Sequence, residues 1–305
     1  MYTIHAVVLN WNNADDTLKC VRSLRRARHV PDEIIVVDNG STDSSESVLR
    51  TELGRECHII QTGENLGYAG GMRVGAEYCL QHHSDLIWFM NNDTEALGET
   101  LDALLASVER NGLQCMYSPK ILHSGDQESV YFSGRYLDVA TGELTLDPPP
   151  HSMEYGAIES DLVSDVIQGA SFIVPVQIIR ELGFMDENYF LYFEEYDYSL
   201  RLARHGIKCI CALSAVVLHR REGAQGSDQL LLDRIRTYYR IRNRILFWRR
   251  CCTPDQAKRF IRRHTLEQFR LLTRARTVND STAGMRLLAL WHGLIGRSGR
   301  VYNPQ

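Results

Sequence analysis

Short apolar runs alternate with helical patterns over the first third of the chain, and this alternation restricts the fold more than any other feature. The runs cover residues 4–10, 33–38, 58–61 and 86–91. Strands that alternate with helices favour right-handed β-α-β units and a mainly parallel sheet, which helices cover on both faces. Ligands of such sheets bind at the carboxyl ends of the strands. Polar residues that directly follow the runs are therefore the first candidates for chemistry.

The pattern predicts the remaining elements with less regularity. Asp15 is expected to cap the first helix. The expected helices span residues 15–28, 44–52, 67–81, 97–111 and 177–182, and the later strands span 117–122, 131–137, 165–175 and 209–219. Residues 141–161 are expected to form an exposed excursion, and an aromatic run at 189–193 precedes a helix that reaches residue 205. Beyond residue 228 the chain reads as helical. We expect a catalytic domain at 1–225 and a basic, helical extension at 226–305.

Composition places the chain among ordinary globular proteins. Of 305 residues, 44% are hydrophobic and 24% charged, and no apolar run approaches the ~18 residues of a membrane span. The N-terminus reads as a first strand and not as a signal peptide. The eight cysteines include no C-x-x-C pair, which suggests buried thiols in a reducing cytosol and disfavours a zinc site. We therefore expect a cytoplasmic protein.

Four polar features follow predicted strands or apolar runs. They are Asp38, the pair Asn92-Asp93, the pair Glu194-Glu195, and His219. Each alone has an ordinary interpretation, such as a turn, a helix cap or a satisfied histidine. Four together in one α/β chain favour a joint site. Within it, Asp93 is a hard oxygen ligand suited to Mg²⁺ or Mn²⁺.

An ordered set of motifs gives these features a family context. The motifs are Val7–Asn12, Val37–Asp43, Asn65–Gly71, Asn91–Asp93, Gln168–Ala170, Gly183–Asp186, Phe193–Asp197, Leu200-Arg201, His219 and Tyr239–Arg244. Together they resemble the family 2 inverting glycosyltransferases, and most closely their rhamnosyltransferase-like branch. The resemblance covers about residues 3–250. It implies an α/β protein of the GT-A (nucleotide-diphospho-sugar transferase) fold, with a mostly parallel central sheet, flanking helices and a C-terminal helical extension.

The resemblance also implies the roles of individual residues. Asp93 and His219 would form the metal–diphosphate site, with His219 acting as a ligand or through hydrogen bonding. Contacts to the nucleotide sugar are implied for Asn10, Asn12, Asp38, Asp43, Asn65, Gly67, Gly71, Arg73 and Asn92. The glycines of the Asn65–Gly71 turn would allow close approach of the backbone to the nucleotide. Acceptor contacts are implied for Gln168, Gly169 and Asp197, although Asp197 could instead cap the following helix.

The catalytic base is expected within the acid pair. Inversion requires one general base to take the acceptor hydroxyl proton, and the family places it in such a pair. Glu195 occupies the catalytic position, where relatives usually carry Asp, and Glu194 is the alternative. Two further departures are Asn91-Asn92 in place of another acid and Arg73 in place of Asn. Arg73 could pair with a phosphate or be a solvated helix residue.

Three functions are consistent with these residues. The leading one is transfer of a sugar from a nucleotide-diphosphate sugar, with deoxythymidine-diphosphate rhamnose suggested by the branch, to a glycan or lipid-linked acceptor in cell-surface polysaccharide biosynthesis. A nucleotidyltransferase would carry a glycine-rich phosphate loop after the first strand, which residues 9–16 lack. A non-catalytic sugar-binding protein would not need Asp93, the acid pair or His219.

The C-terminal extension is strongly basic. Residues 234–276 hold 14 Lys and Arg against two acids, although the whole chain has a net charge of −4. Arginines alternate with aromatic and aliphatic residues over 234–250, a pattern that suits an anionic membrane surface at the inner face of the cell membrane. The alternative is a helix packed on the catalytic domain with an ordinary charged face. No nucleic-acid-binding module accompanies the charge, so nucleic acid is not expected as a partner.

Overall fold

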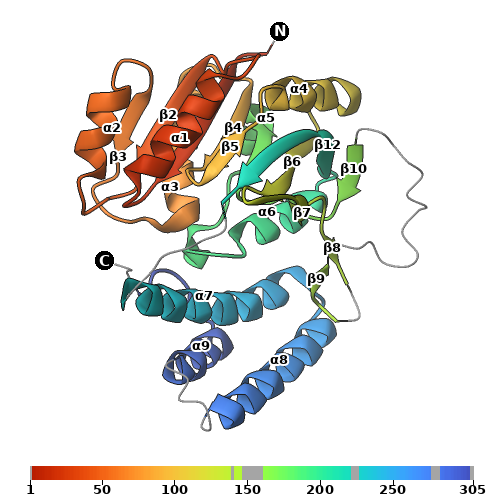
Figure 1. The fold of residues 1–305 in the computed structure, drawn as a ribbon. Coiled ribbons are helices and arrows are strands. Elements are labelled where there is room, and N and C mark those ends of the chain that lie inside the picture. The colour runs from red at the N-terminus through yellow and green to blue at the C-terminus, as the bar shows by residue number, and fades with distance from the viewer. Residues whose placement is uncertain (1, 139–140, 146–160, 221–226, 276–281, 303–305) are drawn as a thin grey trace.

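The computed structural model describes residues 2–138, 141–145, 161–220, 227–275 and 282–302. Within these residues the chain forms an α/β body and three long C-terminal helices (Figure 1). The strands are β1 (Ile4–Asn10), β2 (Glu33–Asp38), β3 (His58–Gln61), β4 (Leu86–Asn91), β5 (Thr94–Ala96), β6 (Cys115–His123), β7 (Asp126–Phe132), β8 (Tyr136–Leu137), β9 (Leu144–Thr145), β10 (Asp161–Ser164), β11 (Ser171–Pro175) and β12 (Lys208–His219). The helices are α1 (Ala14–Arg25), α2 (Ser45–Leu53), α3 (Gly67–Gln81), α4 (Thr100–Asn111), α5 (Val176–Leu182), the 3₁₀ turn η1 (Glu187–Tyr189), α6 (Glu194–Ala203), α7 (Ser227–Cys251), α8 (Pro254–Ala275) and α9 (Ala283–Ile295).

One central sheet carries the order β10-β12-β6-β11-β4-β1-β2-β3 along the described part of the chain, with β5 and β7 paired at its side. Strands β3, β2, β1 and β4 are parallel, as the alternation with helices predicts. In this register Asn10 lies opposite Asp38, and Leu9 lies opposite Asn91. The carboxyl ends of β2, β1 and β4 therefore meet at one edge of the sheet.

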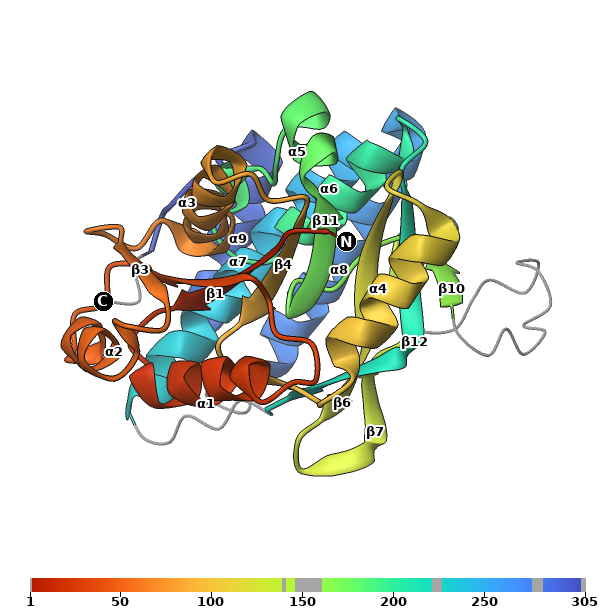
Figure 2. The same cartoon turned by 90° about the horizontal axis from the view of Figure 1, so that it is seen from above.

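Helices cover the sheet on both faces, which explains why the strands read as continuous apolar runs. Helices α1 and α4 lie on one face, and α3, α5 and α6 lie on the other (Figure 2). Two large hydrophobic clusters fill the interfaces. One includes Val8, Trp88 and Leu104, and the other includes Val7, Phe89 and Phe172. This arrangement confirms the predicted fold class.

Four local expectations are corrected. Asn13, and not Asp15, caps α1, because its side-chain oxygen accepts a hydrogen bond from the Asp16 amide (3.3 Å). The single strand expected at 131–137 is two strands, β7 and β8, separated by Gly134 at φ +102°. The strand expected at 165–175 begins only at Ser171, as β11, because residues 165–170 connect it to β10, and β5 was not predicted. Most of the excursion at 141–161 lies outside the described residues.

The aromatic run before α6 is a strained turn and not the end of a strand. Phe190, Tyr192 and Phe193 have φ values of 66°, 68° and 76°, a region that side chains other than glycine rarely adopt. Such turns persist when surrounding contacts fix them. Here Asn243, buried on α7, donates to the carbonyls of Tyr189, Leu191 and Tyr192 at 2.9, 2.7 and 2.9 Å.

Helix α7 packs its aromatic side against the body. Tyr238, Tyr239, Phe247 and Trp248 are all at most 1% exposed. The aromatic residues of 234–250 therefore stabilise the protein interior and do not form a membrane-facing anchor, which corrects that part of the expectation. No helix of the described residues is long and apolar enough to cross a membrane.

Candidate active site

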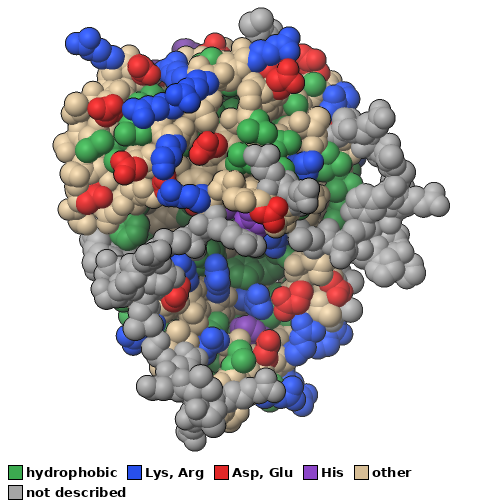
Figure 3. All heavy atoms as spheres, viewed as in Figure 1, with side chains coloured by type: hydrophobic (Ala, Val, Ile, Leu, Met, Phe, Trp, Pro, Cys, Tyr) green, Lys and Arg blue, Asp and Glu red, His purple; other side chains and the backbone are tan. Residues whose placement is uncertain are grey.

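A cavity of about 610 Å³ lies between the carboxyl ends of the strands and α7. The space-filling view shows the molecule hollowed between its upper body and the C-terminal helices (Figure 3). Three of the four predicted features line this cavity: Asp93, the pair Glu194-Glu195, and His219. The fourth feature, Asp38, lies at the end of β2 and is fully buried. The other polar lining residues are Tyr68, Asn91, His123, Tyr131, Arg135, Glu143, Gln168, Tyr192, Tyr196, Arg220, Arg240 and Arg244.

Asp93 lies between the end of β4 and the start of β5, and His219 is the last residue of β12. Because β5 and β12 are antiparallel, the start of β5 lies beside the end of β12, and Asp93 and His219 come together. Nε2 of His219 lies 3.3 Å from Oδ1 of Asp93, and His219 pairs with Thr94 across the ladder. Within the described residues, Oδ1 of Asp93 has no contact of this kind besides His219, and the buried Nδ1 of His219 has no hydrogen-bond partner. An unsatisfied buried nitrogen in a residue that lines the cavity suggests a binding position, since such groups are normally satisfied.

These two side chains fit one cation with an incomplete protein shell. The described residues contain no cluster of three or more potential ligands. Mg²⁺ typically takes one or two carboxylates and completes its octahedron with water and substrate phosphates. Asp93 and His219 could therefore hold a divalent cation together with a diphosphate, and His219 favours Mn²⁺ over Mg²⁺.

Glu194 and Glu195 begin α6 directly after the strained turn, and both are buried. Burial raises the pKa of Glu195 to about 7, although Arg135 and the backbone amides of Glu195, Gly169 and Tyr196 favour its charged form. Burial and the neighbouring Glu195 also raise the pKa of Glu194 well above its ordinary value. Two adjacent acids in different surroundings suit different roles.

The loop before β11, which holds Gln168 and Gly169, lines the cavity together with Glu194 and Glu195. Gln168 is buried, and its amide nitrogen lies 3.5 Å from the hydroxyl of Tyr131. At Gly169, a Cβ would stand 3.5 Å from Oε1 of Glu195, so only a small residue leaves this face of the carboxylate open. Tyr68 donates to the Gly169 carbonyl and fixes this loop against α3. Gln168 and Gly169 thus lie where acceptor contacts are expected.

Asn10 and Asp38 form a buried polar hub at the ends of β1 and β2. The amide of Asn10 donates to Asp38 (3.1 Å), and Ser41 and Gln61 also donate to that carboxylate. Asn92 turns inward and donates to Thr17 (3.1 Å) and to the carbonyl of Asn13 (3.2 Å). Three protein donors thus hold the Asp38 carboxylate and connect it to the loops above it, and its contact to a base stays a prediction.

Two predicted nucleotide contacts connect the surface loops that follow β1 and β2. Asn12 accepts a hydrogen bond from the amide of Thr42 (2.7 Å). Asp43 is exposed and accepts from the amide of Ser45 (2.9 Å), at the start of α2. Both side chains remain on the nucleotide side of the sheet, so their predicted contacts stay open.

The Asn65–Gly71 turn has a structural role that the sequence interpretation missed. Asn65 is buried and accepts from the amide of Gly67 (2.9 Å). Gly67 has φ +76°, and a Cβ there would clash with the carbonyl of Phe190. A Cβ at Gly71 would lie 2.5 Å from a methyl group of Leu9. These glycines therefore allow protein segments to approach each other, and their contact to the nucleotide stays a prediction.

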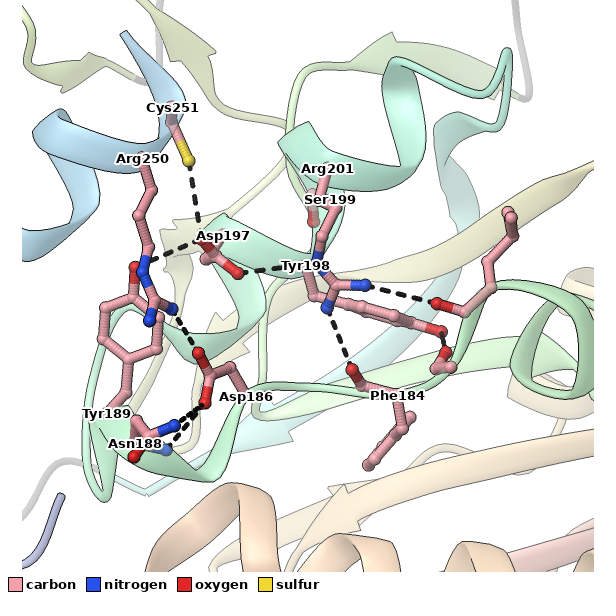
Figure 4. A network of polar contacts seen from close by, with 12 residues as sticks. Phe184, Asp186, Asn188, Tyr189, Asp197, Tyr198, Ser199, Arg201, Arg250 and Cys251 are labelled. Carbon is pink, nitrogen blue, oxygen red and sulfur yellow. Dashed lines mark hydrogen bonds and ion pairs between the residues drawn. The ribbon is translucent and has the colours of Figure 1, made fainter. Parts of the chain in front are cut away.

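Two predicted site residues point away from the cavity. Arg73 is half-exposed on α3 and forms ion pairs with Glu77 (3.6 Å) and Glu187, which fits the solvated interpretation and not a phosphate contact. Asp197 accepts from the hydroxyl of Tyr189 (3.2 Å) and contacts Arg201 and Cys251 (Figure 4). Asp197 therefore stabilises the junction of α6 and α7 and does not contact an acceptor.

Sequence reasoning did not assign several cavity residues. Arg135 follows the break at Gly134, and no motif marks it. Arg240 and Arg244 belong to the Tyr239–Arg244 motif and to the basic extension, but no site role was predicted for them, although both line the cavity. Tyr68 lies inside the Asn65–Gly71 motif, which was the one available signal for it.

The fold and this site define a nucleotide-sugar transferase architecture, and comparison with known proteins gives the family. Residues 6–156 match the family model described as "Glycosyl transferase family 2". Residues 6–156 therefore form a family 2 glycosyltransferase domain, which covers the parallel sheet and Asp93. The family assignment favours the transferase interpretation over the nucleotidyltransferase one.

Curated relatives share about a quarter of the sequence. The low-salt glycan biosynthesis hexosyltransferase Agl10 of Haloferax volcanii is 25% identical, over 66% of this chain and 62% of its own length. The galactofuranosyltransferase GlfT1 of Mycobacterium tuberculosis is 26% identical, over 78% and 76%. The N-acetylglucosaminyl-diphospho-decaprenol L-rhamnosyltransferase of the same species is 25% identical, over 68% and 72%. The match thus spans less than two thirds of the first relative.

A solved structure supports the fold. The crystal structure of GalNAc-T7 with UDP, GalNAc and Mn²⁺ superposes with a TM-score of 0.63 and 13% identity, over 87% of this chain and 55% of that chain. At this identity the likeness concerns the fold alone.

Proposed function

We propose that this protein is an inverting glycosyltransferase that moves one sugar from a nucleotide-diphosphate sugar to a hydroxyl of a glycan or lipid-linked acceptor, in cell-surface polysaccharide biosynthesis. One observation carries the proposal. The buried acid pair Glu194-Glu195 lines the same cavity as the contacting pair Asp93 and His219. A candidate base and a candidate diphosphate site therefore share one space of about 610 Å³, a usual size for a small-molecule site.

Glu195 is the proposed base. It takes the proton of the acceptor hydroxyl while that oxygen attacks the anomeric carbon and the nucleoside diphosphate leaves with the bonding electron pair. A pKa of about 7 suits a base at neutral pH. Burial and the neighbouring Glu195 both oppose ionisation of Glu194 and raise its pKa. The positive charge of Arg135 favours the carboxylate form of Glu195, which is the form that can accept a proton.

The donor is proposed to lie with its diphosphate at Asp93 and His219. A divalent cation, Mg²⁺ or Mn²⁺, would be held by these two side chains and would neutralise charge on the leaving diphosphate. Arg220 follows His219, lines the same wall and contacts Asp16. Deoxythymidine-diphosphate rhamnose is the proposed donor, because the motifs resemble the rhamnosyltransferase-like branch and an L-rhamnosyltransferase is among the relatives.

We place the protein at the cytoplasmic face of the membrane, with α8 and α9 as the contact surface. Leu287, Trp291, Leu294 and Ile295 recur on one face of α9, and all are more than a third exposed. Leu294 shares an apolar groove with Leu266 of α8, and Arg249, Lys258 and Arg262 line the same groove. Apolar side chains among cations suit an anionic bilayer.

A donor screen that follows nucleoside diphosphate release tests the function. We expect turnover with one nucleotide sugar in the presence of Mn²⁺ or Mg²⁺, and a loss of at least ~100-fold in Asp93→Asn. Turnover that chelation leaves unchanged would remove the metal role of Asp93. Absence of turnover with every donor, despite sugar binding, would favour the non-catalytic interpretation.

A further inference from the structure

Two arginines of α7 face the cavity from the side opposite the strand ends. Arg240 and Arg244 are four residues apart, so they lie one above the other on the same helix face. Like charges at this spacing repel each other by a few tenths of a kcal/mol. Two arginines at a cavity wall are therefore expected to be stabilised by an anion.

Aromatic rings hold both guanidinium groups in place. The Arg240 guanidinium lies 4.6 Å from the ring centre of Tyr192, and the Arg244 guanidinium lies 6.0 Å from the rings of Phe193 and Trp248. Stacking occupies the flat face of the guanidinium, and one N–H of Arg240 also donates to the hydroxyl of Tyr192 at 3.4 Å. The remaining N–H groups can contact a phosphate. The side chains are thus partly ordered before any ligand binds.

Arg244 can exchange its present partner for a ligand. It forms an ion pair with Glu143 at 3.5 Å, and Arg263 of α8 contacts the same carboxylate at 3.3 Å. Glu143 would keep Arg263 if Arg244 turned to an anion. The exchange therefore leaves the partly exposed Glu143 carboxylate with one cation.

The position of the pair separates it from the donor diphosphate. Asp93 and His219 belong to the strand ends, whereas Arg240 and Arg244 belong to α7, which lies across from them in Figure 1. Glu194 and Glu195 start α6 and line the same cavity. A base must contact the acceptor hydroxyl, so the wall away from the donor diphosphate faces the acceptor.

We propose that Arg240 and Arg244 form a phosphate subsite for the acceptor, which is therefore a phosphate- or diphosphate-linked lipid and not a neutral glycan. This inference rests on the proposed function and deepens it. It also gives the basic extension a direct part in the site.

Isothermal titration of the full chain with geranyl diphosphate tests the subsite without an activity readout. We expect the double variant Arg240→Gln/Arg244→Gln to weaken geranyl diphosphate binding at least ~tenfold, because two charge-assisted contacts are lost. Binding of UDP and dTDP with Mn²⁺ should change less than about twofold. The double lysine variant should restore part of the affinity, and Arg28→Gln, an exposed arginine paired with Glu99, serves as the control.

Three results would overturn the subsite: no binding of geranyl diphosphate by the wild-type chain, equal binding by the double glutamine variant, or equal binding of geraniol. An equal loss of UDP and dTDP affinity would also overturn it, by assigning the arginines to the donor. A chain that fails the donor screen but binds geranyl diphosphate through these arginines would contradict the proposed function alone.

Discussion

At the scale of single residues, the surroundings of Glu194 and Glu195 distinguish two otherwise identical side chains. Both are buried at the start of α6, but Arg135 and the Gly169 amide favour ionisation of Glu195. Burial and the Glu195 charge oppose ionisation of Glu194. These surroundings are the physical reason for proposing Glu195, and not Glu194, as the base, a choice that the sequence left open.

The first prediction concerns catalysis by this pair. Glu195→Gln should lower kcat by ~10²–10⁴-fold, the usual contribution of a general base. Wild-type activity should rise with pH through about 7 as Glu195 loses its proton. Initial rates across a pH series test both points. Glu194→Gln is the matched variant, and if it alone abolished turnover, the base would move to Glu194.

The second prediction concerns stability against pH. A carboxyl group whose pKa is higher in the folded protein than in the unfolded chain binds more protons when folded, so stability falls as pH rises between the two values. Glu194→Gln removes such a group, since the pKa of Glu194 is raised by burial. Its Tm should therefore exceed that of the wild type at pH 8, and the difference should shrink toward pH 4. A difference independent of pH would contradict the burial effect.

The third prediction separates two costs of replacing a glycine: the cost of a left-handed backbone and the cost of a steric clash. Gly63 and Gly67 have nearly equal φ values, +80° and +76°, but only Gly67 has neighbours where a Cβ would stand. Gly63→Ala should cost ~1–2 kcal/mol in the free energy of unfolding, the penalty of a left-handed residue. Gly67→Ala should cost clearly more, because its Cβ clashes with the Phe190 carbonyl. Urea denaturation measures both, and equal losses would refute the clash.

At the scale of elements, α7 positions the catalytic acids through the turn that precedes them. Arg242 and Asn243 are fully buried on α7, and they donate to the carbonyls of residues 188–192. That turn holds three residues at positive φ directly before Glu194. A helix of the C-terminal extension therefore acts on the geometry of the catalytic domain. The predicted boundary at residue 225 stays a prediction.

The fourth prediction tests this link. Asn243→Ala should lower the free energy of unfolding by ~1–3 kcal/mol, because buried carbonyls lose their donor. As a positioning residue, Asn243 should also affect the base, so kcat should fall more than donor KM rises and the pH profile should shift. Asn111→Ala, at the end of α4, is the control. A loss of stability with an unchanged pH profile would limit Asn243 to a structural role.

At the scale of the whole molecule, the exposed apolar face of α9 lies away from the sheet, with the cations of α8 beside it. The fifth prediction is that the chain sediments with vesicles containing phosphatidylglycerol and less with pure phosphatidylcholine. Trp291→Ser/Ile295→Ser should weaken binding at least ~tenfold, since both side chains are more than half exposed and would be buried in the bilayer. Val163→Ser, an exposed apolar residue on β10, is the control. Unchanged binding would exclude α9 as the contact surface.

Sequence patterns predicted the parallel half of the sheet almost to the residue, because β1, β2, β3 and β4 are buried runs whose hydrophobicity is local information. They failed at β7 to β11 and at residues 190–193. There the backbone follows Gly134 and the donors of α7, which lie far away along the chain. Asp93, Glu195 and His219 were predicted because each follows an apolar run, whereas Arg135 was missed because no pattern surrounds it.

The sequence by itself determined the fold class, the family motifs and the residue types of the candidate site, since these depend on periodicity and on residues close together in the chain. Only the tertiary structure decided which polar groups share the cavity. It buried Asp38 under protein donors, turned Arg73 and Asp197 away, and brought two arginines of α7 to the cavity that Asp93 lines. The physical reason is that a side chain's direction and solvation depend on partners from distant elements, which a linear pattern does not contain.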